Sequence, residues 1–407
     1  MTWLENLFRK ILGLFRKKPQ EPPKPAAEED IKTRIAKYKE AVRLDPNDGS
    51  AQYNLGAAYI ELRRYAEAIL PLKEAVRVNP DHPTAYYHLG KSLVETGRDE
   101  DAVDALRFAM GKNPESLAIK KLLAEAHKNL CVWYGRVKRY EESMKHFNAA
   151  ILVVPDYGPA YLALGMNYTH LGRYQDAIDT FKKTLDMDPN LVVDVHYNYG
   201  IVYAKLGDHK KSIKHFKEAI EINPKSALPH LHLGTLYLKL ERYEEAVERL
   251  RDAVILSPKV AAEGYYRLGV ALMKLERYQE ALKPLADALE LTPNHPAVQD
   301  SYVEAALKTA QTLRQDKKYQ EEIELLRAAA KVNPEKPDIH ALLAEIYDIL
   351  VEPANAMVHG SIAKQLYVEN RDEAGLTRSM RRLVGVSKKY GYKIEDFAKV
   401  KIPRRKA

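Results

Sequence analysis

The sequence predicts an all-α solenoid, a stack of similar helical hairpins in place of one globular core. Two observations carry this prediction: prolines recur at an almost constant spacing, and a pattern of small and aromatic residues recurs in register with them. The chain has 407 residues, of which 46% are hydrophobic and 29% charged, values that are ordinary for a soluble folded protein.

The prolines give the period of the repeat. Successive prolines lie 34 or 35 residues apart, except for two intervals of 41. A proline ends a helix because it lacks an amide proton and its ring clashes with the preceding turn. We therefore expect each one to follow the second helix of a hairpin. The prolines are Pro46, Pro80, Pro114, Pro155, Pro189, Pro224, Pro258, Pro293 and Pro334.

Within each period, apolar residues at helical spacing indicate two amphipathic helices, and small residues mark where these helices touch. One repeat shows the pattern as Leu164 and Gly165, then Tyr168, then Ala177. A larger side chain at the glycine or the alanine would push the two helices apart. The glycine recurs as Gly56, Gly90, Gly165, Gly200, Gly234 and Gly269.

This pattern resembles the tetratricopeptide repeat family, and the resemblance covers about residues 29–370. The resemblance implies a right-handed superhelical solenoid of tetratricopeptide-type helical hairpins, whose first helices line a concave groove that binds partner segments.

Two repeats are seven residues longer than the others, and the extra residues precede the first-helix pattern. We expect long first helices near residues 117–137 and 296–316, either as the ends of a functional sub-array or as tolerated length variants. Residues 371–389 have apolar side chains at helical spacing and are expected to form a capping helix, since the end of a repeat array needs a cover. Residues 390–407 form a basic tail, which we expect to face solvent or a membrane.

The resemblance also implies which positions face the groove, namely those just before and after the glycine on each first helix. In this chain they are mostly apolar, which suits an extended or helical peptide with regularly spaced apolar anchors. The alternative is that some of them pack against neighbouring first helices. The predicted groove residues are Tyr53, Tyr87, Leu162, Met166, Tyr197, Ile201, Leu231, Leu238, Tyr266, Val270 and Met273.

Some members of the family bind a terminal carboxylate through a Lys, Asn, Asn, Lys and Arg set on three adjacent first helices. Only single positions match here, at Asn54, Asn198 and Arg267. We therefore do not expect the chain to bind the carboxylate tails of chaperones.

Residues 1–18 are predicted to form an amphipathic helix that lies in the plane of a membrane. Its charges interrupt every apolar run, so it is too short and too polar to span a bilayer, and residues 19–28 form a proline-rich linker to the repeats. The alternatives are that this helix docks onto a partner protein or onto the repeats, or that it is frayed. The expected membrane-binding residues are Trp3, Leu4, Leu7, Phe8, Ile11, Leu12 and Phe15 on the apolar side, with Arg9, Lys10, Arg16 and Lys17 for anionic lipid.

No pattern for catalysis, a cofactor or a metal is evident. The single cysteine, Cys131, excludes an internal disulfide and a paired-cysteine zinc site, and it fits a reducing compartment such as the cytoplasm. The nearest two histidines, His230 and His232, are two apart on a helix, which sends their rings to different faces. The basic tail contains aromatic residues but no known nucleic-acid module, so we do not expect nucleic-acid binding.

These observations predict a non-enzymatic scaffold for protein or peptide partners, without a cofactor, that is cytoplasmic and peripheral at an anionic membrane surface. The alternative is a soluble adaptor or regulatory subunit whose N-terminal helix docks onto a partner protein.

Overall fold

The computed structural model describes the backbone of residues 25–402 and 404, and side chains from residue 29 onward. The described part contains 20 α-helices and no strand, which confirms the predicted all-α class. The chain divides into two compact units, one ending at Ala219 and one beginning at Ile220. The predicted helix of residues 1–18 lies outside the described residues.

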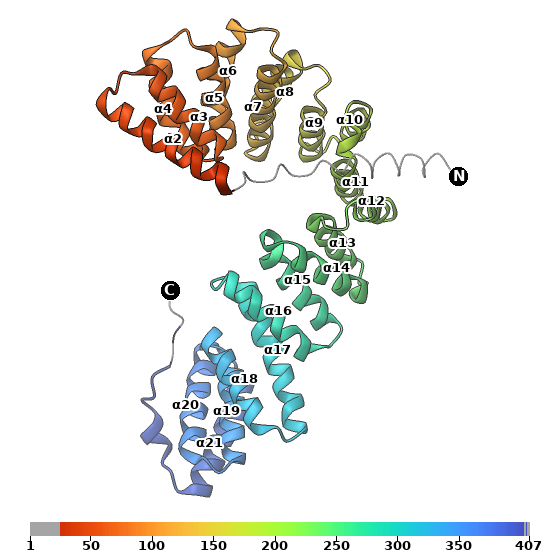
Figure 1. Cartoon of the computed structure of the whole chain (residues 1–407). Helices are drawn as coiled ribbons and strands as arrows, with labels where there is room; N and C mark the ends of the chain where they lie inside the picture. Colours follow the sequence, from red (N-terminus) through yellow and green to blue (C-terminus); the bar gives the residue numbers. More distant parts are fainter. Residues whose placement is uncertain (1–24, 403, 405–407) are drawn as a thin grey trace. The chain divides into compact units, whose positions relative to one another are not determined.

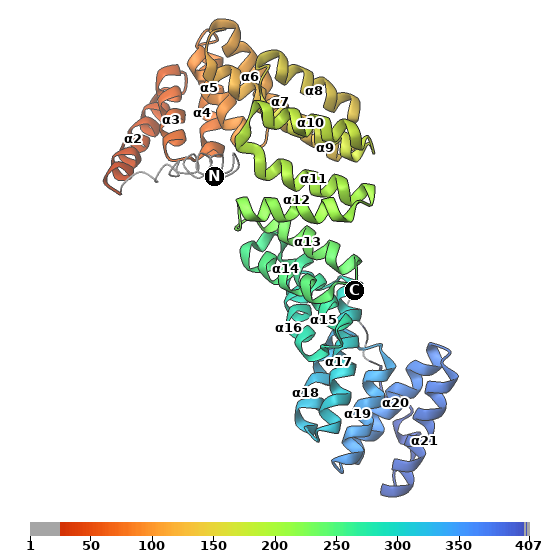
Figure 2. The same ribbon diagram turned by 90° about the vertical axis from the view of Figure 1, so that its right-hand side faces the viewer.

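Each unit is a run of antiparallel helices in which helices adjacent along the chain pack on one another (Figure 1, Figure 2). The first unit contains α2 (Pro25–Leu44), α3 (Gly49–Glu61), α4 (Tyr65–Val78), α5 (Pro83–Glu95), α6 (Asp99–Lys112), α7 (Leu117–Arg136), α8 (Tyr140–Val153), α9 (Gly158–His170), α10 (Tyr174–Met187), α11 (Val192–Leu206) and most of α12 (His209–Ile222). The second unit contains α13 (Ala227–Lys239), α14 (Tyr243–Leu256), α15 (Ala261–Lys274), α16 (Tyr278–Leu291), α17 (Pro296–Gln315), α18 (Tyr319–Val332), α19 (Pro337–Ile349), α20 (Pro353–Glu369) and α21 (Glu373–Tyr390).

The predicted prolines mark the ends of the second helices. Each of the nine lies two residues past the last residue of an even-numbered helix, from α2 to α18. The odd-numbered helices from α3 to α19 are therefore the first helices of the hairpins. Both units consist of hairpins of the predicted type.

Small residues set the distance between the two helices of a hairpin. A Cβ atom added at Gly200 would lie 2.5 Å from the ring of Phe216 on α12, and Phe216 is 1% exposed. The second helix contributes a buried alanine or serine in return, and Ser212 Oγ donates a hydrogen bond of 2.7 Å to the Gly200 carbonyl. The predicted reason for the glycines, close approach of two helices, thus matches the packing.

The turn inside each hairpin has one residue in the left-handed conformation, always at the same position of the repeat. Glycine occupies it at Gly97, Gly172 and Gly207. Other hairpins have a non-glycine residue at this position. One of them is Val351, which has a φ of 60°. A β-branched residue is strained in this conformation.

The two long repeats have long first helices. α7 and α17 contain 20 residues each, whereas α3, α5, α9, α13 and α19 contain 13. The added residues therefore extend the helix itself by about two turns.

The two ends of the described chain differ from the expected boundaries. α2 begins at Pro25, so the last four residues of the predicted linker are helical. At the other end α21 packs on α20, and the tail that follows folds back onto the last hairpin. There Tyr392, Ile394 and Phe397 pack against the apolar core of this end, and Gln365 donates a hydrogen bond of 3.3 Å to the Val400 carbonyl. This part of the basic tail is therefore not free in solvent.

None of the helices in the described ranges is both long enough and apolar enough to cross a membrane.

Candidate functional site

The predicted groove residues lie on first helices, and most of them keep part of their surface. Ten of the eleven are neither buried nor fully exposed. The first helices of successive hairpins also contact one another directly. Such pairs include α3 with α5, α9 with α11, and α13 with α15. Within each unit, neighbouring first helices therefore present a shared apolar surface.

Leu231 is the exception, because it is only 3% exposed. It lies beside Gly264 of α15, where a Cβ atom added at the glycine would be 3.8 Å from Leu231 Cδ1. The space that a side chain at Gly264 would need is filled by Val254 of α14, whose Cγ1 would lie 2.5 Å from the added Cβ atom. Leu231 thus packs inside the second unit and offers no surface to a partner.

In the first unit, the surface combines packing with exposure. Leu162 and Met166 on α9 pack against a buried cluster that includes Val195 and Val202 of α11, yet both remain partly exposed. These two side chains therefore pack against the next first helix with part of their surface and leave the rest open. Ile201 on α11 is also partly exposed, and the Tyr197 ring lies 6.1 Å from the Phe216 ring.

An earlier pair of tyrosines is separated from these residues by α7. The ring of Tyr53 stacks on His88 at 5.5 Å and 11°, and Tyr87 lies beside the same histidine at 5.6 Å. On α7 the equivalent position is Lys128, whose Nζ donates a 2.6 Å hydrogen bond to Asn129. The apolar row of the first unit is therefore interrupted by a charge.

In the second unit, Leu238 on α13 precedes Tyr266, Val270 and Met273 on α15, and all four are partly exposed. The Tyr266 ring lies 6.0 Å from that of His295, just before α17. These residues form the apolar part of the first-helix surface of this unit.

Sequence reasoning missed a cavity further along the same unit. It has a volume of about 390 Å³ and is lined by residues of α17, α19, α20 and α21. Leu307 and Ala341 in its lining occupy the repeat position that Tyr266 has on α15. The register of the repeat indicates these two positions. A row of large apolar residues does not, because Ala341 is small and most other residues of the lining are polar or charged.

Charged side chains make this cavity different from the apolar rows. Arg382 donates a 2.9 Å hydrogen bond to Glu345, and the Tyr367 hydroxyl donates one of 2.9 Å to Asp338. Burial, followed by this bond to Asp338, raises the pKa of Tyr367. The hydroxyl therefore stays protonated and serves as a donor at neutral pH.

Two of the three residues that match the carboxylate-binding set already bond to other groups of the protein. The Asn198 amide donates a 2.8 Å hydrogen bond to the Asp194 carbonyl in its own helix. Arg267 donates one of 2.8 Å to Thr235 and pairs with Glu263.

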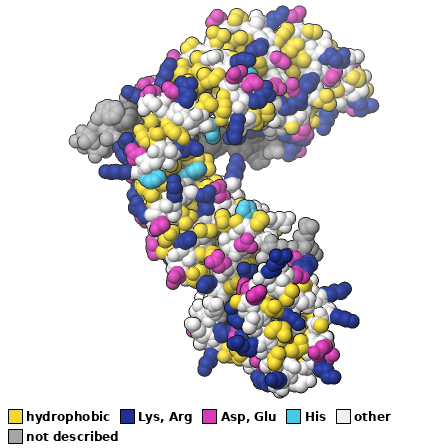
Figure 3. All heavy atoms as spheres, turned by 180° about the vertical axis from the view of Figure 1, so that it is seen from behind, with side chains coloured by type: hydrophobic (Ala, Val, Ile, Leu, Met, Phe, Trp, Pro, Cys, Tyr) yellow, Lys and Arg dark blue, Asp and Glu magenta, His cyan; other side chains and the backbone are white. Residues whose placement is uncertain are grey.

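Three hairpins each contain a pair of histidines that sequence reasoning also missed. The partners are always 19 residues apart, one on each helix, and their Nδ1 atoms lie 3.0 to 3.1 Å apart. Histidine side chains reach the face of the molecule shown in Figure 3. The pairs are His127 with His146, His196 with His215, and His340 with His359.

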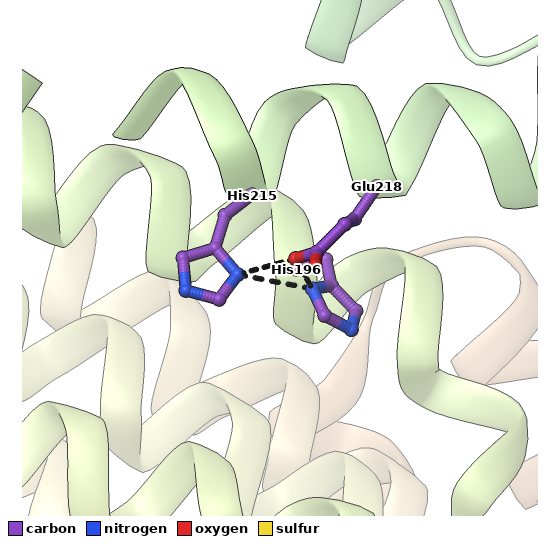
Figure 4. A group of neighbouring side chains, drawn as sticks. All are labelled: His196, His215 and Glu218. Atoms are coloured by element: carbon purple, nitrogen blue, oxygen red, sulfur yellow. Dashed lines mark hydrogen bonds and ion pairs between the residues drawn. The ribbon is translucent and has the colours of Figure 1, made fainter. Parts of the chain in front are cut away.

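One of these pairs has a carboxylate beside it. Glu218, on the same face of α12 as His215, places Oε2 2.9 Å from the Nδ1 atom of His196 and 2.9 Å from that of His215 (Figure 4). Burial lowers the pKa of both histidines, against the opposing effect of Glu218. Among the described residues, this is the one group of three side chains with the donor types and spacing to hold a metal ion.

Family models of the tetratricopeptide repeat match several segments of the chain. Models described as tetratricopeptide repeat match residues 37–69, 122–190, 191–256 and 231–296, and one described as TPR repeat matches residues 58–97. Together these segments make up more than half of the chain. No curated protein matches it.

Solved structures with the same kind of repeat are similar to the chain at low identity. A tetratricopeptide repeat protein from Parabacteroides merdae is 17% identical, with 66% of this chain and 98% of that chain covered and a TM-score of 0.46. The pilF protein of Pseudomonas aeruginosa is 21% identical, covering 55% and 96% with a TM-score of 0.34. TTC0263, a thermophilic TPR protein of Thermus thermophilus, is 23% identical, covering 47% and 99% with a TM-score of 0.33.

The proline period, the glycine contacts between paired helices and the segments matched by family models agree with one another. The chain belongs to the tetratricopeptide repeat family.

Proposed function

We propose that the chain is a protein-interaction scaffold that binds segments of partner proteins on its first helices and has no catalytic site of its own. The observation that carries this proposal is the incomplete burial of large apolar residues at equivalent positions on consecutive first helices. Apolar surface left open in a regular row favours partners with regularly spaced apolar anchors. The first unit offers such a row on α3 and α5 and again on α9 and α11, and the second unit offers one on α13 and α15.

Selection of peptides from a random library on the full-length chain tests this proposal directly. The selected peptides should carry apolar residues at regular spacing. Met166→Glu and Val270→Glu place a charge in the row of the first and the second unit, and each should weaken the peptides that bind its unit by at least about 10-fold, since an apolar anchor would then face an unpaired charge.

Two matched controls place the same charge on an exposed apolar residue of a second helix. Leu152 on α8 is 85% exposed and Ile255 on α14 is 80% exposed, so Leu152→Glu and Ile255→Glu should leave peptide binding unchanged. The proposal is wrong if no peptide is selected, or if the four variants bind the selected peptides equally well.

We further propose that residues 1–18 hold the scaffold reversibly on an anionic membrane surface. The proposal is supported by the sequence of this segment, in which apolar residues share one helical face and five Lys and Arg residues lie on the others. Each Lys or Arg near an anionic surface contributes about 1 kcal/mol.

Co-sedimentation with liposomes tests the membrane proposal, using the full chain and a variant that lacks residues 1–18. The full chain should pellet with anionic vesicles at low salt and much less with neutral vesicles or at high salt. Equal behaviour of the two proteins would contradict the proposal and favour the soluble adaptor, in which residues 1–18 dock onto a partner protein.

A further inference from the structure

We propose that His196, His215 and Glu218 form a binding site for a divalent transition-metal ion, and that Zn²⁺ is the ion that best fits the donor set. The site lies in the hairpin of α11 and α12 and takes no part in the apolar surface proposed to bind peptides.

The three donor atoms already have almost the spacing that a metal requires. The two Nδ1 atoms lie 3.1 Å apart, and each is 2.9 Å from Glu218 Oε2. Ligands of a tetrahedral Zn²⁺ ion, at about 2.0 to 2.1 Å from the metal, lie about 3.3 Å from one another. The triangle therefore needs to open by only a few tenths of an ångström to seat the ion on one side of its plane.

The donor types also agree with zinc. Two imidazoles and a carboxylate form a ligand set that zinc proteins use, with water in the fourth position. The side chains of His196, His215 and Glu218 are 20%, 17% and 30% exposed, so an ion can enter from solvent and keep a water ligand. Sulfur is absent from the set, which disfavours Cu⁺ and iron–sulfur centres.

The surrounding residues hold two of the ligands in place. The Tyr203 ring stacks on His215 at 5.4 Å and 7°. Lys214 Nζ lies 3.7 Å from Glu218 Oε1, which leaves Oε2 directed at the histidines. The close contact of Gly200 with Phe216 fixes the spacing of the two helices that carry the ligands. Such outer contacts are what orients ligands in metal sites.

One carboxylate oxygen of Glu218 lies at the centre of this group. Glu218 Oε2 is buried and accepts no well-directed hydrogen bond, although both Nδ1 atoms are within 2.9 Å of it. Two imidazole nitrogens and one carboxylate oxygen thus converge on one point.

The other two histidine pairs are internal controls. They have Nδ1 distances of 3.0 Å, but the position three residues after the second histidine is Ala149 in one and Ile362 in the other. Neither hairpin supplies a third ligand there. If Zn²⁺ binding requires Glu218, the chain should have one site, in the hairpin of α11 and α12. If a histidine pair alone were enough, all three hairpins would bind the ion.

The test is titration of the untagged, chelator-treated full chain with Zn²⁺, followed by calorimetry and by competition with a chromophoric chelator. We expect one tight site per chain. Loss of an outer contact typically weakens metal binding about 10- to 100-fold, so His215→Ala and Glu218→Gln, which remove ligands, should weaken it by at least about 100-fold. His146→Ala should leave the tight site intact. Visible absorption of bound Co²⁺ provides a second readout of the nitrogen and oxygen ligands.

Glu218→Gln is the decisive variant, because it keeps the size of the side chain and both histidines, and far-ultraviolet circular dichroism checks that it folds. The proposal is overturned if the full chain shows no tight site, if Glu218→Gln binds Zn²⁺ as tightly as the natural chain, or if His146→Ala abolishes the tight site.

Discussion

The Arg314 guanidinium closes over the carboxylate of Glu322, a side chain with no exposed surface. Arg314 Nε lies 3.0 Å from Glu322 Oε1, and the same guanidinium pairs with Glu345 and donates a 3.3 Å hydrogen bond to the Leu342 carbonyl. One arginine of α17 therefore joins α18 and α19.

Arg314→Met should destabilise this end of the chain by about 3–5 kcal/mol, since it leaves a buried carboxylate without a partner. Hydrogen exchange of the α18 amides measures the effect locally, which suits a repeat array whose ends can open separately. Adding Glu322→Leu to Arg314→Met should recover most of the loss. The surface variant Arg173→Met, which removes the exposed pair with Asp176, should change little. Unaltered exchange in Arg314→Met would show that the pair does not hold these helices.

Val351→Gly should stabilise the hairpin of α19 and α20 by about 0.5–1 kcal/mol. Val351 has a φ of 60° and is 66% exposed, so the glycine relieves backbone strain and loses little packing, while its flexibility in the unfolded chain offsets part of the gain. Protection of the α19 amides should rise accordingly. The reverse change at the equivalent turn, Gly97→Val, should lower protection in the hairpin of α5 and α6. If Val351→Gly lowers protection instead, the valine is not strained.

Gly165→Ala should destabilise the first unit by about 1–3 kcal/mol. The new Cβ atom would lie 2.3 Å from Phe181 Cε1, and the Phe181 ring is fully buried and cannot move aside without disturbing its neighbours. Gly385→Ala is the matched control, because no atom lies within 4 Å of the new Cβ there. That substitution in α21 should stabilise the helix by about 0.5–1 kcal/mol. Thermal unfolding of both variants compares them, and a gain at Gly165 would contradict the close contact.

The His127 imidazole should make the first unit sensitive to acid. Burial, and then the neighbouring His146 and Arg107, lower the pKa of His127 from 6.5 to about 4. Above pH 6.5 both folded and unfolded chains are neutral at this position. As the pH falls from about 6.5 to about 4, His127 becomes protonated in the unfolded chain but stays neutral in the folded chain. The free energy of unfolding therefore falls by up to about 3 kcal/mol.

His127→Tyr tests whether this histidine causes the acid sensitivity. The hairpin should accept the change, because tyrosine occupies the same repeat position at Tyr86, Tyr161 and Tyr265. Denaturation of the two proteins between pH 7 and pH 4 should show a flatter dependence for the variant. Parallel curves would assign the acid sensitivity to other groups.

The hairpins were predictable because their determinants are local and repeated. A glycine such as Gly56 and the leucine it contacts, Leu72, keep the same separation in most repeats, so sequence spacing is enough to pair the helices. The burial of Leu231 was not predictable in this way, since it depends on the packing of α13 against α15 of the next repeat, where Leu231 contacts Gly264.

Two further features needed the structure for different reasons. The tail after α21 is basic, and composition alone indicates exposure, yet Ile394 and Phe397 pack on the last hairpin. The histidine pairs are present in the sequence as a 19-residue spacing, which places the two partners on different helices and not within one short motif. The same sequence separation recurs in three hairpins, for example between His127 and His146 and between His340 and His359. Such recurrence indicates spatial neighbours in a repeat protein, whereas a single domain contains no repeats to compare.

The shared position of the histidine pairs also has an evolutionary consequence. α8 carries Ala149 where α12 carries Glu218, so one codon separates the hairpin of α7 and α8 from a copy of the same set of three side chains. In a globular domain, a second set would require new positions in an unrelated environment. Here duplication of a repeat copies the backbone geometry together with the side chains. A set of side chains acquired in one repeat can therefore be copied to another repeat or lost from one without changing the rest of the array.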